Sequence, residues 1–244
     1  MAPSDPFTLP VLYEDAWLIA VHKPPGMLVH RSKLASHNDT PVALQTVRDQ
    51  IGQPVFPVHR LDRPTSGLLV FARDSETAAG LAEQIRAGQL EKTYQAVVRG
   101  WPETDAGSTD RPLKPEYADN KAEASEQPAR TDWRCLGRTE IPEPVDKYPT
   151  ARYSLLEASP KTGRTHQIRR HLKHLNHPII GDARHGQAVH NRFFHERYGC
   201  DRLLLAATAL RFRHPRTGND LALTCPVAED MAQVVEALGF VPEG

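Results

Sequence analysis

Short stretches in which apolar and polar residues alternate follow one another along this chain, and they constrain its fold more than any other feature. Residues 11–26 alternate in this way and stop at a Pro-Pro-Gly sequence, which predicts two short strands and a turn. The alternation returns in residues 91–100, 150–158, 203–214 and 221–225. Because these strands outnumber the helices and adjoin one another, we expect an α+β fold with a mixed, mostly antiparallel sheet.

Other segments carry apolar residues at helical spacing. They are residues 40–51, 75–88, 165–175 and 228–239. In the first, Thr40 is the expected N-cap and Pro41 the first helical residue, and in the second Gly88 marks the end. Residues 56–67 are dense in Pro, Gly and charge and lead into an apolar run, so they predict a loop that feeds a buried strand.

The length of 244 residues with 39% hydrophobic content suits one large domain or two tightly joined subdomains. We expect a flexible segment at residues 1–10, a folded domain over 11–244, and an irregular insertion with one strand at about 101–150. No stretch approaches the roughly 18 apolar residues of a membrane span, which favours a cytoplasmic protein, with a monomer as the default. The three cysteines are far apart and suggest neither disulfides nor a cysteine zinc site.

Charge is distributed unevenly although the total is zero. Residues 160–216 contain twelve Lys and Arg against three Asp and Glu, with eight histidines, whereas residues 101–150 contain seven against eleven. A basic lobe of this kind suits binding to a phosphate backbone, and a solvated surface of mixed charge is the alternative. Neither GxGxxG nor GxxxxGK[ST] occurs, so the usual signatures of dinucleotide and nucleoside-triphosphate binding are absent.

Asp62 is the strongest candidate for a catalytic group. In the segment HRLDRPTSG it lies between Arg60 and Arg63, in a loop stiffened by Pro64 just before the predicted buried strand. A nearby arginine keeps a carboxylate ionised, and an ionised carboxylate can act as nucleophile or base at a glycosidic bond. The alternative is that Asp62 only satisfies backbone donors in a turn.

The predicted helix at 165–175 has an apolar stripe and a basic face. Arg170 and Lys173 lie opposite the stripe with His166 near them, where they can meet phosphates, unless they only form a solvated basic surface. Arg169 falls at the flank of the stripe, where a guanidinium can reach a partly buried carboxylate, and we expect it to be the partner of Asp62.

Two further residue types leave alternatives open. Tyr94 is either a core tyrosine or a residue that stacks on a flipped base. His166, His171, His174 and His177 raise the possibility of a metal site, since helical i and i+3 histidines can share an ion. Neither HExxH nor HxxEH occurs, so we expect no metal.

Three segments together resemble the RluA family of pseudouridine synthases: HRLDRPTSGL, KTYQAVV and KTGRTHQIRRHL. The resemblance places that family's catalytic aspartate on Asp62, its active-site tyrosine on Tyr94 and its active-site arginine on Arg169. It implies a central sheet split into two subdomains with the active cleft between them, an RNA substrate, and no metal or organic cofactor. The residues expected to bind RNA are Arg60, His59, Arg164, His166, Arg170 and Lys173.

The wider strings LVHRS, TVRDQIGQ, KYPTARYSLLE and HPIIGDARHG are similar to a branch of that family that acts on the uridine at position 65 of certain tRNAs. An S4-type RNA-binding domain, found in many relatives, is not expected before Val11. An enzyme acting on rRNA, or on both RNAs, is the alternative. Rivals from other classes are a non-catalytic RNA-binding module and a metal-dependent phosphodiesterase built on the histidines.

Overall fold

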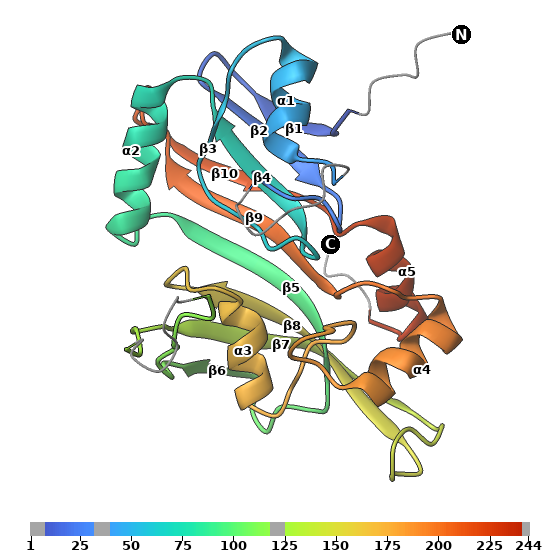
Figure 1. Cartoon of the computed structure of the whole chain (residues 1–244). Coiled ribbons are helices and arrows are strands. Elements are labelled where there is room, and N and C mark those ends of the chain that lie inside the picture. The colour runs from blue at the N-terminus through green and yellow to red at the C-terminus, as the bar shows by residue number, and fades with distance from the viewer. Residues whose placement is uncertain (1–7, 32–39, 118–124, 241–244) are drawn as a thin grey trace, which may run out of the picture. The chain divides into compact units, whose positions relative to one another are not determined.

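The structure, a computed structural model, describes residues 8–31, 40–117 and 125–240, and it divides into two compact units. Unit 1 comprises Met1–Leu90 and Ala207–Pro226, and unit 2 comprises Glu91–Ala206 and Val227–Gly244 (Figure 1). From length and composition, one large domain and two tightly joined subdomains were both expected as possibilities. Most of the expected flexible segment lies outside the described residues, but Leu9 is buried and exchanges two hydrogen bonds with the side chain of Gln50.

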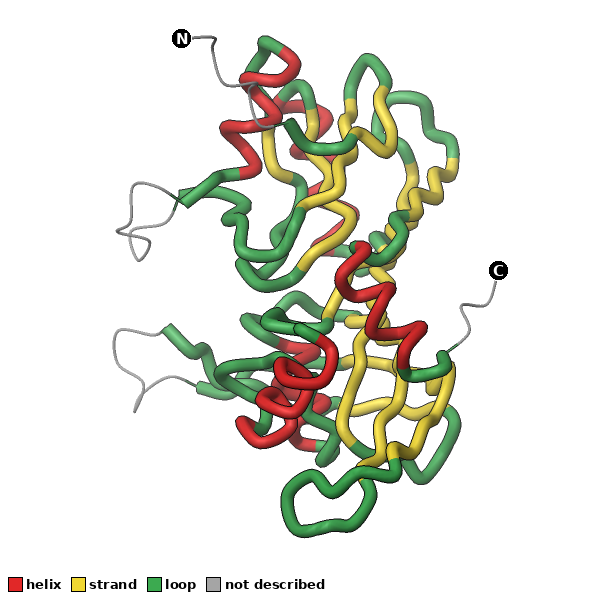
Figure 2. Tube along the Cα trace, turned by 90° about the vertical axis from the view of Figure 1, so that its right-hand side faces the viewer, coloured by secondary structure: helices red, strands yellow, loops and turns green. Residues whose placement is uncertain are grey.

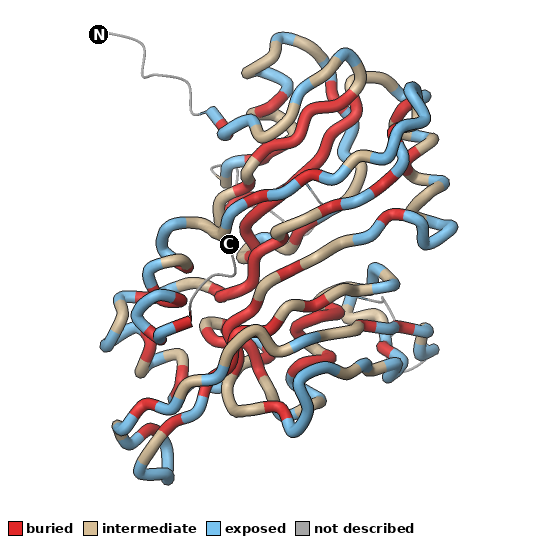
Figure 3. Tube along the Cα trace, turned by 180° about the vertical axis from the view of Figure 1, so that it is seen from behind, coloured by how far each residue is buried: buried red, intermediate tan, exposed pale blue. Residues whose placement is uncertain are grey.

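Unit 1 is built on the strand order β1-β2-β4-β9, with β3 beside β4 and β10 beside β9. Its elements are β1 (Val11–Glu14), β2 (Leu18–Lys23), α1 (Ala43–Ile51), β3 (Phe56–Pro57), β4 (Ser66–Ala72), α2 (Ser75–Arg86), β9 (Leu205–Arg213, in unit 1 from Ala207) and β10 (Asp220–Thr224). Strand β2 pairs antiparallel with β4, and every residue of β4 is buried, as the red tubes of Figure 3 show. The predicted buried strand is therefore confirmed.

The first helix starts later than the sequence suggested. The N-cap of α1 is Val42, without a side-chain capping hydrogen bond, so the prediction of Thr40 as cap and Pro41 as first helical residue was wrong. The cause is tertiary: the N–H groups of Ala43 and Leu44 donate to backbone carbonyls of residues 28 and 29. These carbonyls satisfy donors that a capping side chain usually serves.

Unit 2 has the strand order β5-β8-β7-β6, with antiparallel registers. Figure 2 draws the strands in yellow and the helices in red. Its elements are β5 (Glu91–Arg99), β6 (Ala106–Thr109), β7 (Thr131–Ile141), β8 (Ala151–Pro160), α3 (Gln167–His174), α4 (Ala188–Tyr198) and α5 (Glu229–Ala237). One buried cluster joins Val97 of β5 and Tyr153 of β8 with Phe194 of α4 and Val235 of α5. This core fixes α4 and α5 against the sheet.

The sequence missed two elements of unit 2. Residues 101–150 contain two strands instead of one, because β6 has almost no apolar residues and is held by its pairing with β7. Helix α4 was not predicted, since its buried positions include His190, which breaks an apolar stripe. Among the described residues, no helix is long and apolar enough to span a membrane.

Candidate active site

The loop that carries Asp62 lies between β3 and β4 and is held through its main chain. Asp62 is half-buried, and its carbonyl accepts a hydrogen bond from the N–H of Thr65 at 3.0 Å. The Arg63 carbonyl accepts from the N–H of Gly26 at 2.9 Å, and the Arg63 guanidinium donates to the Gly26 carbonyl at 3.0 Å. The loop is thus tied to the Pro-Pro-Gly turn after β2.

Lys23 reinforces this connection from inside unit 1. Its ammonium is fully buried and donates to the carbonyls of Pro24, Met27 and Arg63 at 2.9, 3.0 and 3.2 Å. A buried cation needs such partners, because desolvation without them costs several kcal/mol. Lys23 therefore fixes the segment on either side of the turn, a role that was not predicted from the sequence.

Glycine is required where this loop enters β4. Gly67 has φ +109°, and a Cβ there would lie 2.2 Å from the carbonyl oxygen of Ala207. His59, at the other end of the loop, is half-buried and accepts a hydrogen bond from the N–H of Val70 through Nε2 at 3.2 Å. Arg60 is exposed. Of the loop residues expected to bind RNA, Arg60 is thus available at the surface and His59 also supports β4.

In unit 2, Tyr94 lies on β5 and pairs in register with Ala158 of β8. Its exposed fraction is 8%, so most of the ring is packed in the unit. Lys92, two residues before it, is on the same strand, and burial lowers the pKa of its ammonium. The position of Tyr94 is compatible with a core tyrosine and with a tyrosine that stacks on a flipped base.

Arg169 occupies the buried flank of α3, as its position beside the apolar stripe predicted. Its exposed fraction is 5%, and it meets a carboxylate in a bidentate pair. Arg169 Nε donates to Oδ2 of Asp182 at 2.7 Å, and a terminal nitrogen donates to Oδ1 at 2.8 Å. The sequence named Asp62 as the partner of Arg169, and that pairing stays a prediction, whereas Asp182 was not foreseen.

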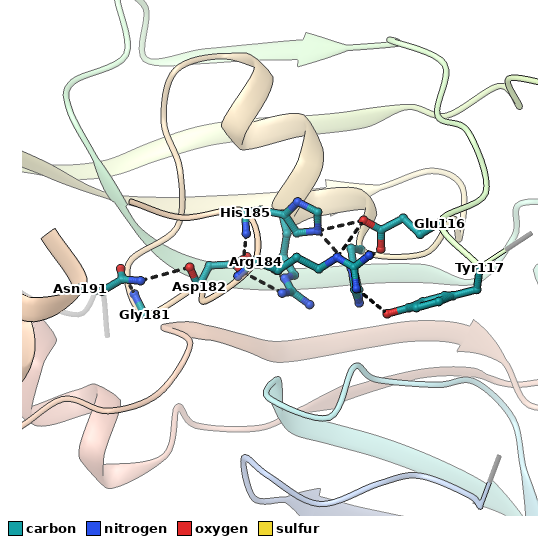
Figure 4. Close-up of polar contacts among 9 residues, drawn as sticks. Glu116, Tyr117, Gly181, Asp182, Arg184, His185 and Asn191 are labelled. Atoms are coloured by element: carbon teal, nitrogen blue, oxygen red, sulfur yellow. Dashed lines mark hydrogen bonds and ion pairs between the residues drawn. The ribbon is translucent and has the colours of Figure 1, made fainter. Parts of the chain in front are cut away.

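Asp182 is the centre of a tightly hydrogen-bonded loop after α3. Its carboxylate also accepts from the N–H groups of Arg184 and His185, both at 2.9 Å. Burial by itself raises the pKa of Asp182, but these bonds and the Arg169 pair outweigh it and hold the pKa below its usual value. Asn191 spans the loop, accepting from Gly181 N–H and donating to the Asp182 carbonyl (Figure 4).

A second polar cluster lies next to this pair. Glu116, His166 and His185 place one ligand atom each within 4.8 Å of one another, a spacing that a metal ion can use. Arg184 Nε lies 3.5 Å from the Glu116 carboxylate, and its terminal nitrogen donates to the Tyr117 hydroxyl (Figure 4). Nδ1 of His166 and Nε2 of His185 lie 2.5 and 3.2 Å from the Glu116 carboxylate, so the three side chains contact one another directly as a polar network.

The other histidines proposed for metal binding do not form such a set. His171 is buried and uses both ring nitrogens, one with the Thr131 hydroxyl and one with the Arg111 carbonyl, each at 2.9 Å. It cannot share an ion with His174, which is exposed on the same helix. His177 bonds the Arg99 carbonyl through Nδ1. Because both ring nitrogens of His171 already have partners, the structure gives no support to an ion shared between His171 and His174, a possibility that the sequence had raised.

Three further basic residues expected to bind RNA lie around α3. Arg164 is exposed and donates to the Pro128 carbonyl at 3.0 Å, and Arg170 donates to the Lys114 carbonyl at 2.8 Å. Lys173 is exposed and has no ion-pair or hydrogen-bond partner among the described residues. Arg164 and Arg170 thus hold the 101–150 region as well as presenting charge, and Lys173 only presents charge.

The candidate residues belong to both units: Asp62 to unit 1, and Tyr94 and Arg169 to unit 2. Their joint action in one site remains a prediction. Asp182 and Lys23, which contact Arg169 and the Asp62 loop, were not predicted from the sequence. The available signals were a lysine at the end of an apolar strand and an aspartate directly after the apolar run Pro178-Ile179-Ile180-Gly181.

A sequence profile described as RNA pseudouridylate synthase matches residues 17–174, which include Asp62, Tyr94 and Arg169. The chain belongs to this family. The RluA-type resemblance, and with it an RNA isomerase, is confirmed. Matched relatives include two proteins named tRNA pseudouridine synthase C, from Vibrio cholerae and Salmonella typhi. Each is 48% identical over 237 residues and 95% of this chain, covering 96% and 90% of the relative.

Solved structures agree on the fold. Human RNA Pseudouridylate Synthase Domain Containing 4 is 25% identical with a TM-score of 0.69, covering 94% of this chain and 93% of that one. Human RNA Pseudouridylate Synthase Domain Containing 1 has the same TM-score of 0.69 at 20% identity, over the whole of both chains. The predicted α+β pseudouridine synthase fold is therefore confirmed.

Proposed function

We propose that this protein converts uridine to pseudouridine in tRNA, with Asp62 as the catalytic carboxylate. The observation that carries the proposal is the presence of Asp62, Tyr94 and Arg169 in a chain that is 48% identical, over 95% of its length, to a protein named tRNA pseudouridine synthase C. Uridine and pseudouridine are isomers. The reaction therefore needs no oxidant, reductant or co-substrate.

The roles follow from the chemistry of the side chains. The target uridine leaves its stack and enters a pocket, at a cost of a few kcal/mol. Asp62 assists cleavage of the bond between N1 of the base and C1′ of the ribose. The base then rotates, C5 bonds to C1′, the proton on C5 is lost, and N1 gains one. Three first steps remain compatible with Asp62: attack on the sugar, attack on the ring, and removal of a proton.

Tyr94 and Arg169 support this step. We assign to Tyr94 stacking on the uracil ring and proton exchange through its hydroxyl. Arg169 orients the Asp62 carboxylate, and the bidentate pair with Asp182 supports that role by fixing the direction of the guanidinium. A guanidinium has further N–H donors after two have been used, so one arginine can serve two carboxylates.

Backbone binding is assigned to the basic residues around these groups: Arg60, His59, Arg164, His166, Arg170 and Lys173. Exposed Arg60 and Lys173 are the strongest of these candidates, because phosphates reach exposed cations without displacing a protein contact. We place the enzyme in the cytoplasm, where tRNA is found, and we expect a monomer.

Tritium release tests the catalytic step. Incubation with tRNA labelled at C5 of uridine should release tritium, and Asp62→Asn should abolish release, by a factor on the order of 10⁴. Asp49→Asn is the matched control, because Asp49 is an exposed carboxylate in the same unit whose one ion-pair partner among the described residues is its neighbour Arg48. Release by Asp62→Asn at the rate of the control would overturn the assignment.

The substrate is a separate question, and we assign position 65 of tRNA. Pseudouridine mapping of total RNA from cells lacking the protein should show the loss of one tRNA site at that position. Loss of an rRNA site instead would favour the alternative enzyme class. RNA binding without any isomerisation over both RNA pools would favour a non-catalytic module.

A further inference from the structure

A pocket of about 480 Å³ lies within unit 2, apart from the residues assigned above. It is formed by the end of β5, the start of β8, the residues after α3, and one side chain of α4. Its volume is within the range of about 300 to 1,000 Å³ that is typical of small-ligand sites. Among the described residues that line it there is no carboxylate, so the pocket has a positive character.

Arg99 is the main source of that charge. It is half-buried at the end of β5, and its guanidinium has no carboxylate or hydrogen-bond partner among the described residues. Arg152 adds a second cation, although Glu140 lies 3.4 Å from its Nε and partly neutralises it. A half-buried guanidinium without a partner is costly to keep and is well suited to bind an anion.

His190, in α4, supplies a neutral donor to the same space. Its exposed fraction is 4%, and its Nδ1 lies 2.9 Å from the Tyr153 hydroxyl. The Tyr153 hydroxyl has no other acceptor among the described residues, so it donates to Nδ1. Burial lowers the pKa of His190 to about 4, which keeps the ring neutral at physiological pH. Its proton therefore lies on Nε2, which has no partner among the described residues.

Two aromatic rings, those of Trp101 and Tyr148, form part of the wall. The indole of Trp101 is fixed by a hydrogen bond from Nε1 to the Thr139 carbonyl at 3.0 Å, and the Arg152 guanidinium covers it at 4.4 Å. Tyr148 is 50% exposed. Stacking on an exposed aromatic ring is the usual way in which proteins bind an unpaired base, regardless of its sequence.

Asn176 and His177 add hydrogen-bonding groups beside the rings. Asn176 is exposed in a left-handed conformation, with φ 62°. The Nδ1 of His177 lies 3.0 Å from the Arg99 carbonyl, which can only accept, so this nitrogen carries the proton. The pocket thus combines hydrogen-bond donors that can bind an anion, an aromatic ring for stacking, and polar groups that can meet the edge of a base.

We propose that this pocket binds a nucleotide of the RNA substrate, with its phosphate on Arg99 and the His190 Nε2–H and its base on Tyr148. A phosphate alone would leave the aromatic wall unused, and an apolar ligand would leave the unpaired guanidinium unused. The inference rests on the proposed function for the identity of the RNA. A free nucleotide has the same chemistry as a nucleotide within RNA, and the experiment distinguishes the two.

The test measures KM and kcat for tritium release from C5-labelled tRNA transcript by the full chain at several KCl concentrations. Arg99→Gln should raise KM about five- to tenfold with kcat unchanged, and it should reduce the salt slope of binding by about one. Tyr148→Ala should raise KM about fivefold or more without changing that slope. Arg197→Gln is the matched control, because Arg197 is exposed on α4, pairs with Glu143 and lies outside the pocket.

A titration with UMP, followed by tryptophan fluorescence, identifies the source of the nucleotide. Saturable quenching by UMP that Arg99→Gln abolishes, with an unchanged KM for tRNA, would overturn RNA as the ligand. Unchanged KM in both variants together with no quenching would overturn the pocket itself. Absence of tritium release by the unmodified chain would contradict the proposed function instead, and filter binding of the transcript to the same variants would then test the pocket.

Discussion

The loop around Asp62 in unit 1 and the Arg169–Asp182 pair in unit 2 are fixed by different means. The loop is held through backbone carbonyls and N–H groups, and the buried ammonium of Lys23 donates to several of these carbonyls. Arg169 is held through its own charged group by Asp182, whose side chain is fully buried. Main-chain anchoring fixes the backbone that carries the Asp62 side chain, whereas a bidentate pair sets the direction of a guanidinium. The two regions should therefore respond differently to mutation.

The largest effect on stability is expected from Asp182→Ala. Removing one partner of a buried ion pair leaves the other charge uncompensated, so unit 2 should lose about 3 to 5 kcal/mol of unfolding free energy. Urea denaturation followed by circular dichroism measures it. The control is Asp201→Ala, because Asp201 contacts His195 and both side chains are more than half exposed, and it should cost under about 1 kcal/mol.

A double variant makes this prediction more specific. Arg169→Met with Asp182→Ala removes both charges, so its loss should be clearly smaller than the sum of the two single losses. Equal losses for Asp182→Ala and Asp201→Ala would show that the buried pair does not hold unit 2 together.

Lys23→Met should have a smaller effect on stability, in unit 1. Three carbonyls lose a charged donor, which should lower the unfolding free energy by about 2 to 3 kcal/mol. Because the Asp62 loop loses its contact with the Lys23 ammonium, kcat for tritium release should fall about tenfold or more while KM changes little. Arg48→Met, at an exposed position of α1, should change neither quantity. A normal kcat in Lys23→Met would mean that the loop keeps its geometry without the buried ammonium.

Acid should destabilise unit 2 through its buried histidines. Burial lowers the pKa of His190 to about 4 from an ordinary value of 6.5. Between these values the unfolded chain binds a proton that the folded chain does not, so stability falls as the pH drops from 6.5 towards 4. The loss from His190 should reach about 2 kcal/mol at pH 5. Denaturation at pH 7 and pH 5 measures it, and His190→Gln should reduce the difference; an unreduced difference would assign it to other groups, such as His185.

Most of the fold was predictable because alternation and helical spacing survive in the elements that form the cores. Strands β2, β4, β5 and β8 and helix α2 have regular apolar patterns, and the structure confirms each one. Strand β6 and helix α4 were not predicted because their stability comes from neighbouring elements. Strand β6 depends on backbone pairing, and helix α4 packs through a buried histidine. The start of α1 was predicted wrongly for the same reason, since carbonyls from residues 28 and 29 replace a capping side chain.

The site was predictable in part. The burial of Arg169 followed from its place at the flank of an apolar stripe, because helix geometry is local. Its pairing with Asp182 depends on the path of a loop thirteen residues further on, which no periodicity encodes. Lys23 was missed because a lysine at the end of a strand usually reaches solvent, and only the tertiary structure surrounds this one with carbonyls.

The smallest effects are expected on the basic face of α3, where two neighbouring cations differ in their contacts. Lys173 is exposed without a partner among the described residues, so Lys173→Gln should weaken tRNA binding two- to fivefold and reduce the salt slope by about one. Arg170 also donates to the Lys114 carbonyl, so Arg170→Gln should lower the protection of residues 111–117 in hydrogen exchange besides weakening binding. Filter binding at several salt concentrations, with hydrogen exchange on both variants, separates the two roles. Lower hydrogen-exchange protection of residues 111–117 in Lys173→Gln, or unchanged protection in Arg170→Gln, would show that the contact with Lys114 does not distinguish the two residues.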